Sequence, residues 1–525
     1  MTARQLPERP NLEQLKRQAK DLLRSAREHD AAALQRFRIL PTFANLSDVE
    51  LARRPLALHD AQSVIGREYG FDSWRALHER VDELTIEFAA AVDQFIEAAT
   101  DGRSDRAERL LALYPAIARA NVHTALLLGD ADAVEARLAE HPELATAPGG
   151  PRGWEPLHYA CYTSVGAPSG AREEGLVAIA RRLLLLGADP NLRFPWLHHG
   201  VHRPVLWGAM AVVRSLRLAA ALLDAGADPS DGVTLPLAAA AGNLAALDLL
   251  FAHGADVNRP WATDGSAPLY AILHWAKTAE GARWLLDHGA DPDPVFAENG
   301  ETPLHVVAAS WDASLAEGLV NRGVDIARPR ADGRTPYAVA ELSGNREVAA
   351  WLLAHGAPGG LSDVDRLVSA CSRGDKAAAL AMLDARPDLR RAIVPEHYPA
   401  FYRAAERNDT KALEAMLACG FDPDRPDDSI GKTALHAAAM EGWPDAVHVL
   451  LAHGASVTVR DREFKAQPLI WAAEGSRTPR RDRDHAAVGR MLLDAGSPLD
   501  WQQSEEPSEG IVEIVNAWRG LQERR

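Results

Sequence analysis

The sequence has few cysteines and none of the signatures of common catalytic sites. Its 525 residues include three cysteines, Cys161, Cys371 and Cys419, with no CxxC pair. This usage fits a reducing compartment and indicates neither a disulfide framework nor a thiolate metal site. The motifs GxxxxGK[ST], GxGxxG, HExxH and GxSxG are also absent, which argues against nucleotide-binding, metalloprotease and serine-hydrolase chemistry. We therefore expect no catalytic residue, no cofactor and no metal.

Long apolar runs are missing as well. The best candidate, residues 235–255, contains Asn243 and Asp248, whereas a membrane-spanning helix needs about 20 predominantly apolar residues. The N-terminus, MTARQLPERPNLEQLKRQ, lacks the apolar centre of a signal peptide. We expect a soluble, cytoplasmic protein that does not bind membranes.

Basic residues are outnumbered: 57 Lys and Arg face 73 Asp and Glu, which gives a formal net charge of −16. A nucleic-acid interface needs a basic face, so this balance argues against nucleic acid as a partner. Apolar residues make up 47% and charged residues 25%, the proportions of a folded protein.

What the sequence does contain is a repeat. A run of leucines ends in a GADP-like phrase, and a TPLH-like phrase follows, often at a spacing of about 33–35 residues. The first phrase begins at Gly187, Gly226, Gly254, Gly289, Gly323, Gly420 and Gly454, and the second at Glu155, Ala267, Thr302, Thr335, Thr433 and Gln467.

Each phrase has a physical explanation. The glycine follows the leucine run, where a helix ends and the chain needs a positive φ. The threonine of TPLH can cap the next helix, and proline fits its first position because no hydrogen bond is lost there. Small alanines let neighbouring helices pack closely, and leucines form a continuous core between units.

Spacing, turn and cap together resemble the ankyrin repeat family. The resemblance implies an all-α fold: an ankyrin solenoid of helix-turn-helix units with β-turn fingers. We predict about a dozen units from Asp93 onward, with a bend where GAPGGLSD (356–363) replaces a finger. The predicted domains are an N-terminal helical module (1–92), a first sub-stack (93–360) and a second sub-stack (361–525).

Residues 1–92 do not repeat. Asn11 can cap an amphipathic helix, and the stretch HDAQ…IGREYGFDSW is similar to the helical module that precedes ankyrin repeats in bacterial proteins. The resemblance implies no activity for this module. Its Tyr69, Phe71 and Trp74 predict the core of a small bundle, with docking to a partner as the alternative.

Histidines are numerous, at 19, and the repeat explains most of them. The family resemblance implies that His158, His305 and His436, at the TPLH position, hydrogen-bond the adjacent finger. A cluster in a lengthened finger, His198, His199 and His202, has the residue type for Zn²⁺ or Ni²⁺ but no regular spacing and no carboxylate in its loop, so we favour a solvated or partner-contacting loop.

The resemblance also implies which residues face the concave groove, namely those just before TPLH and the two residues that follow the alanines after it. The first half of this groove is then aromatic and the second half charged, and exposed Trp and Tyr fit the chemistry of protein-binding hot spots. We predict that an unidentified protein partner contacts Trp154, Tyr162, His202, His274 and Trp275.

The favoured function is thus a monomeric protein-interaction scaffold. One alternative is an enzyme or a metal- or ligand-binding protein with a site in the insertions around residues 164–202, using His198, His199, His202 or Glu173 and Glu174. Another is docking to nucleic-acid machinery through the Lys- and Arg-containing helices between Lys16 and Arg38, which the net charge of −16 weakens.

Overall fold

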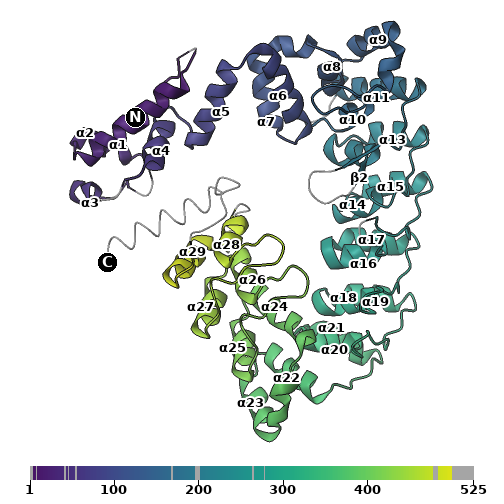
Figure 1. The fold of residues 1–525 in the computed structure, drawn as a ribbon. Helices are drawn as coiled ribbons and strands as arrows, with labels where there is room; N and C mark the ends of the chain where they lie inside the picture. The colour runs from purple at the N-terminus through teal and green to yellow at the C-terminus, as the bar shows by residue number, and fades with distance from the viewer. Residues whose placement is uncertain are drawn as a thin grey trace. The chain divides into compact units, whose positions relative to one another are not determined.

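The computed structural model describes residues 4–498 apart from positions 8, 41–42, 45, 54–55, 167–169, 196–201, 263–264, 277 and 477–482. Helices dominate it (Figure 1). The chain divides into two compact units, Met1–Asp291 (the first unit) and Pro292–Arg525 (the second unit), which are described separately. The predicted domain boundaries at residues 92 and 360 stay predictions.

The first unit begins with a helical module that has its own apolar core. Tyr69, Phe71 and Trp74 pack against this core, as predicted from the sequence. Asn11 caps the first helix, where its Oδ1 accepts a hydrogen bond from the Gln14 N–H at 3.0 Å. The helices are α1 (Leu12–Arg27), α2 (Ala31–Phe37), α3 (Asp48–Ala52), α4 (Leu58–Glu68) and α5 (Trp74–Thr85).

Helix pairs follow in the same unit, and a short two-stranded antiparallel ribbon interrupts them. The ribbon pairs Arg193 with Pro204 and Pro195 with His202. The elements are α6 (Phe88–Thr100), α7 (Ser104–Leu113), η1 (Pro115–Arg119), α8 (Val122–Leu128), α9 (Ala131–Glu140), η2 (Pro142–Ala145), α10 (Pro156–Cys161), α11 (Ala171–Leu185), β1 (Arg193–Pro195), β2 (His202–Pro204), α12 (Val205–Trp207), η3 (Gly208–Val212), α13 (Leu216–Asp224), α14 (Thr234–Ala240), α15 (Leu244–Ala252), α16 (Pro268–Ala271), η4 (Ile272–Ala276) and α17 (Ala279–Asp287).

The second unit continues the alternation of short paired helices. Its elements are α18 (Pro303–Ser310), α19 (Ala313–Val320), α20 (Pro336–Leu342), α21 (Arg346–Ala354), α22 (Asp363–Ser372), α23 (Lys376–Ala385), η5 (Pro387–Ala392), η6 (Pro395–His397), α24 (Tyr398–Glu406), α25 (Thr410–Cys419), α26 (Ala434–Glu441), α27 (Pro444–Ala452), α28 (Pro468–Ser476) and α29 (His485–Asp494).

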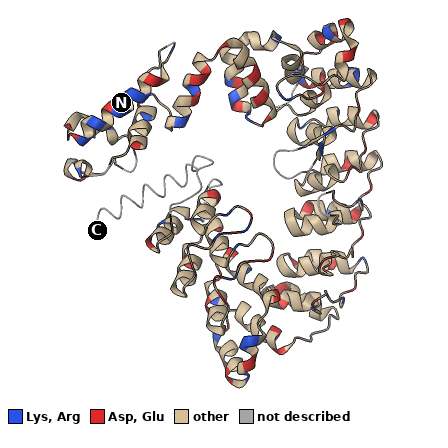
Figure 2. Ribbon diagram, viewed as in Figure 1, with Lys and Arg blue, Asp and Glu red and all other residues tan. Residues whose placement is uncertain are grey.

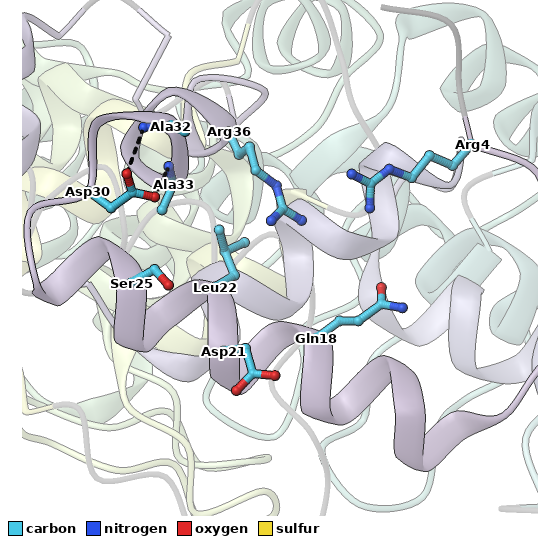
Figure 3. Close-up of a pocket in the computed structure, with 9 residues that line it drawn as sticks. All are labelled: Arg4, Gln18, Asp21, Leu22, Ser25, Asp30, Ala32, Ala33 and Arg36. Atoms are coloured by element: carbon cyan, nitrogen blue, oxygen red, sulfur yellow. Dashed lines mark hydrogen bonds between the residues drawn. The ribbon is translucent and has the colours of Figure 1, made fainter.

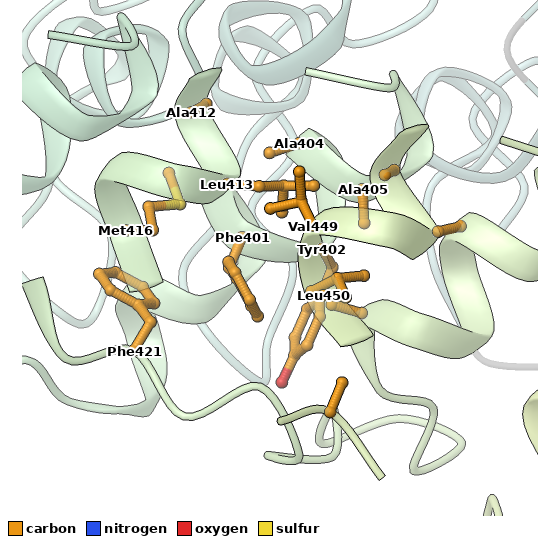
Figure 4. Close-up of a cluster of buried hydrophobic side chains, with 14 of the residues drawn as sticks. Phe401, Tyr402, Ala404, Ala405, Ala412, Leu413, Met416, Phe421, Val449 and Leu450 are labelled. Carbon is orange, nitrogen blue, oxygen red and sulfur yellow. The ribbon is translucent and has the colours of Figure 1, made fainter. Parts of the chain in front are cut away.

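Turns and caps form where the repeat predicts them. Gly226 ends the α13 turn at φ 95°, a conformation that strains any residue with a Cβ. Thr335 caps α20 through a hydrogen bond from the Ala338 N–H, and Pro336 occupies the first position of that helix. Leucines, alanines and aromatic rings from successive helices then form a core that runs from repeat to repeat, as Figure 4 shows around α24, α25 and α27.

Specific side chains join the less regular segments to this stack. Glu83, at the end of the module, is fully buried and accepts hydrogen bonds from Arg109 of α7, the shortest at 2.8 Å. Across residues 356–363, where we predicted a bend, Ser369 of α22 still donates to Glu341 of α20 at 2.5 Å. Within the described residues, no helix combines the length and the apolar character needed to cross a membrane.

Candidate protein-interaction surface

The first helix of each pair carries the residues that we predicted to meet a partner. In the first unit, α10 and α14 lie along one side of the stack and α11 and α15 along the other (Figure 1). We call the side formed by the first helices the first-helix face. It includes the residues just before and after each of these helices.

An aromatic cluster occupies this face near α10. It consists of Trp154, Tyr159, Tyr162, Phe194 and Trp207. The Phe194 ring is its centre, with ring centroids 4.7 Å from Trp154 and 4.6 Å from Tyr162. Phe194 lies on β1, so the ribbon places an aromatic side chain over α10, where an ordinary repeat has a β-turn finger. Trp154 stays half-buried at the edge of the cluster.

The prediction that Tyr162 faces a groove is wrong. Its side chain has no exposed surface, and its hydroxyl donates a hydrogen bond to the Pro204 carbonyl oxygen at 2.9 Å. Phe194 and Trp207, which belong to the lengthened finger and to the helix after it, pack against the Tyr162 ring. Tyr162 therefore anchors the ribbon and is not available to a partner.

His202 lies at the start of β2 and is exposed. The other two histidines of the predicted cluster, His198 and His199, lie outside the described residues. Among the residues that are described, no three His, Cys, Asp or Glu side chains are grouped closely enough to hold a metal ion.

The carboxylates of the preceding insertion serve the packing of the stack. Glu173 Oε1 accepts a hydrogen bond from the Ser215 hydroxyl at 2.6 Å, and Glu174 lies 3.9 Å from the Arg217 guanidinium. Ser215 is the N-cap of α13, so these contacts join α11 to α13. The enzyme alternative gains no support from this arrangement.

Trp275 is the most exposed tryptophan that the structure describes, with 62% of its surface accessible. It lies on the π-helical turn η4, which continues α16. Its neighbour His274 is half-buried, stacks on Tyr270 with ring centroids 5.4 Å apart, and contacts the Trp275 ring at 4.5 Å. The local fold thus presents an indole that is supported from one side.

Histidines at the TPLH position behave differently in the two units. In the second unit, His305 Nδ1 accepts from the Thr302 N–H and Nε2 donates to the Arg334 carbonyl oxygen at 3.2 Å. His436 makes the same pair of contacts with Thr433 and Ala466. The predicted hydrogen bond to the adjacent finger is confirmed for both, and burial lowers the pKa of His305 to about 4.

For His158 that prediction is wrong. Both ring nitrogens are buried and have no hydrogen-bond partner among the described residues, and the imidazole lies between Trp154 and Phe194 at 5.9 and 5.6 Å. Glu155 replaces the usual threonine cap, and the ribbon replaces the finger that would supply a carbonyl. Burial lowers the pKa of His158 to about 4, which keeps the ring neutral.

A network of ion pairs lies around the finger before α20 in the second unit. Arg330 bridges Glu301 and Asp332, at 3.1 and 2.6 Å, and Arg334 bridges Asp332 and Asp365, at 2.9 and 3.0 Å. Burial by itself would raise the pKa of Asp365, but hydrogen bonds from His397, Ser362 and Arg334 hold it below its usual value. The network fixes the finger before α20 against α22 and η6.

The N-terminal module contains a polar pocket of about 300 Å³, and α1 and α2 supply most of its lining (Figure 3). Two of its guanidinium groups, those of Arg4 and Arg36, share the carboxylate of Glu68 at 3.2 and 2.6 Å. These contacts hold α2 and the N-terminal segment to α4. The pocket is lined by Arg4, Gln18, Asp21, Leu22, Ser25, Asp30, Ala32, Ala33 and Arg36.

Charges of both signs alternate along this module (Figure 2). On α1, Lys16 pairs with Glu13 at 2.9 Å and Arg24 with Asp21 at 2.7 Å. The segment between Lys16 and Arg38 therefore does not present an uninterrupted basic face.

Comparison with known proteins agrees with this geometry. Residues 270–363 and 367–498 match the family model described as ankyrin repeats (3 copies). Ankyrin repeats are therefore present over these two segments. Such repeats indicate a protein-interaction module, and the fold is the expected all-α ankyrin solenoid.

Curated relatives share part of this repeat region. The chain is 37% identical over 101 residues to the human (Homo sapiens) ankyrin repeat and SOCS box protein 6, and 31% identical over 101 residues to the Mus musculus protein of that name. Each alignment covers 19% of this chain and 22% of the relative, so the chain spans about a fifth of the curated relatives that it matches. These relatives are mammalian, and the bacterial resemblance of the N-terminal module stays a prediction.

Proposed function

We propose that this protein binds a protein partner on the first-helix face of its ankyrin repeats, with Trp275 as the main contact of the first unit. The observation that carries this proposal is the 62% exposure of a large aromatic side chain on the face that the repeats leave open. Tryptophan is enriched among the residues that dominate binding energy in protein interfaces.

Neighbouring residues support Trp275 in this role. The His274 ring lies against the indole at 4.5 Å, so less side-chain entropy is lost when a partner covers it. Trp154, half-buried in the aromatic cluster, and His202, exposed on the ribbon, supply two further contacts. Tyr162 drops out of the contact set because it is buried. A monomeric state and a cytoplasmic location complete the proposal.

The test compares two exposed apolar residues of the same unit. A photoreactive amino acid is placed at Trp275 or at Leu185, which is 80% exposed at the end of the second helix α11. We expect a discrete protein to be cross-linked from position 275 and not from position 185. Capture of that protein should then fall at least tenfold for Trp275→Ala and remain unchanged for Leu185→Ala.

Trp275→Ala should change the free energy of unfolding by less than about 0.5 kcal/mol, because an exposed side chain contributes little to the folded core. Equal capture of the partner by Trp275→Ala and by the unmodified protein would remove Trp275 from the interface.

A further inference from the structure

Helix α24 in the second unit has one face that the core does not use. Its Phe401, Ala404 and Ala405 are buried among side chains of the neighbouring helices, and Figure 4 shows them pointing into the cluster. Arg403 and Arg407 lie four residues apart, which places them one above the other on a helix. Two like charges at this spacing repel each other, so packing alone does not account for them.

Arg403 has no ion-pair or hydrogen-bond partner among the described residues. Its Nε is closed off from solvent and still makes no hydrogen bond. Within the part of the chain that the structure describes, the Arg407 side chain donates one hydrogen bond, to the Ser343 carbonyl oxygen at 3.5 Å. A half-buried guanidinium without a carboxylate is costly, because desolvation is not offset by pairing.

The two carboxylates that act electrostatically on Arg403, those of Glu301 and Glu406, are already paired with other side chains. Glu301 is paired with Arg330 at 3.1 Å, and Glu406 is paired with Lys432 at 2.9 Å. Burial, together with the charge of Arg407, lowers the pKa of Arg403 to about 10, and the charges of Glu406 and Glu301 oppose this shift. The guanidinium remains charged at neutral pH, so the local surface keeps unpaired positive charge.

We propose that Arg403 and Arg407 form a binding site for a carboxylate side chain of an acidic protein segment. Guanidinium groups match carboxylates through paired N–H donors, and the site offers two such groups one helical turn apart. The net charge of −16 disfavours long polyanions such as nucleic acids, whereas a short acidic segment meets mainly the local positive charge. The assignment rests on the proposed role in protein binding but concerns residues of the second unit, whereas Trp275 belongs to the first unit.

The experiment uses the full chain and three fluorescent probes in an anisotropy titration: the peptide (Gly-Glu)4, its uncharged counterpart (Gly-Gln)4, and the oligonucleotide dT8. We expect the Glu peptide to bind, to weaken between 50 and 300 mM salt, and to bind at least about tenfold more weakly to the double variant Arg403→Met, Arg407→Met, a loss typical of charge-assisted hydrogen bonds. Arg386→Met is the matched control, because Arg386 is exposed and already paired with Asp388 and Asp363.

Thermal stability distinguishes a variant that has lost the binding site from one that has lost its fold. We expect Arg403→Met to melt at or above the temperature of the unmodified protein, because the substitution removes an unpaired, partly desolvated cation. Trp275→Ala should leave Glu-peptide binding unchanged, so a failed Trp275 interface and a failed arginine site give different results. Equal affinity of the double variant and the unmodified protein for the Glu peptide would overturn the site. Equal binding of the Gln peptide, or tighter binding of dT8, would overturn the choice of an acidic protein segment.

Discussion

The histidine of the TPLH phrase meets opposite surroundings in the two units. In the second unit, His305 joins the N-terminus of its own helix to the carbonyl group of the next finger. In the first unit, His158 occupies the same position of the repeat, yet its ring lies among aromatic side chains and makes no hydrogen bond to any residue that the structure describes. The comparison shows that one motif can be held by directed hydrogen bonds or by ring packing, according to what the next finger supplies.

The largest loss of stability should come from removing the Tyr162 ring, which anchors the ribbon of the first unit. Tyr162→Ala deletes a fully buried aromatic side chain, and we expect a loss of about 3–5 kcal/mol in the free energy of unfolding. Urea unfolding followed by tryptophan fluorescence measures it. Tyr162→Phe, which loses only the bond to Pro204, should cost about 1 kcal/mol. A loss below 1 kcal/mol for Tyr162→Ala would mean that ring packing does not hold this region.

A pair of matched substitutions addresses the histidines directly. His305→Leu leaves the Thr302 N–H and the Arg334 carbonyl oxygen without their partner, and should cost about 2–3 kcal/mol. His158→Leu breaks no hydrogen bond and removes two buried, unpaired nitrogens, so stability should stay equal or rise. The urea midpoints of the two variants measure these changes in stability. Equal losses for His305→Leu and His158→Leu would contradict the proposed difference between the surroundings of the two histidines.

The third expected effect is a dependence of folding stability on pH, to which both His158 and His305 contribute. Burial lowers the pKa of His158 and of His305 to about 4, against about 6.5 in the unfolded chain. The unfolded state therefore takes up protons first, and stability that is complete above pH 6.5 is lost as the pH falls towards 4. At pH 5 the loss should be about 2 kcal/mol for each histidine.

Urea midpoints at pH 7 and pH 5 measure this loss. His305→Leu should reduce the difference between the two midpoints, whereas His202→Gln, at an exposed position, should not alter it. A midpoint that is higher at pH 5 than at pH 7 would show that the sign of the linkage is wrong.

Much of the fold could be predicted from the sequence because its signals are local. Gly226 marks a turn through its own φ, and Thr335 and Pro336 mark a helix start through their own backbone groups. The candidate site was less predictable. Trp275 is exposed, but Tyr162, chosen by the same positional rule, is buried. Phe194, which covers Tyr162, and Arg403, which lacks a partner, were not selected, because neither belongs to a repeat position that the family associates with binding.

The sequence by itself determined the repeat: the helix pairs, the turn glycines and the capping threonines follow from backbone preferences within a few residues of each position. Tertiary structure decided which of the resulting side chains reach solvent. Burial and pairing depend on segments far apart in the chain, such as the β1–β2 ribbon over Tyr162 and the Arg330 and Lys432 partners that leave Arg403 unpaired. Periodicity cannot specify such contacts, because they arise from insertions and substitutions that break the period.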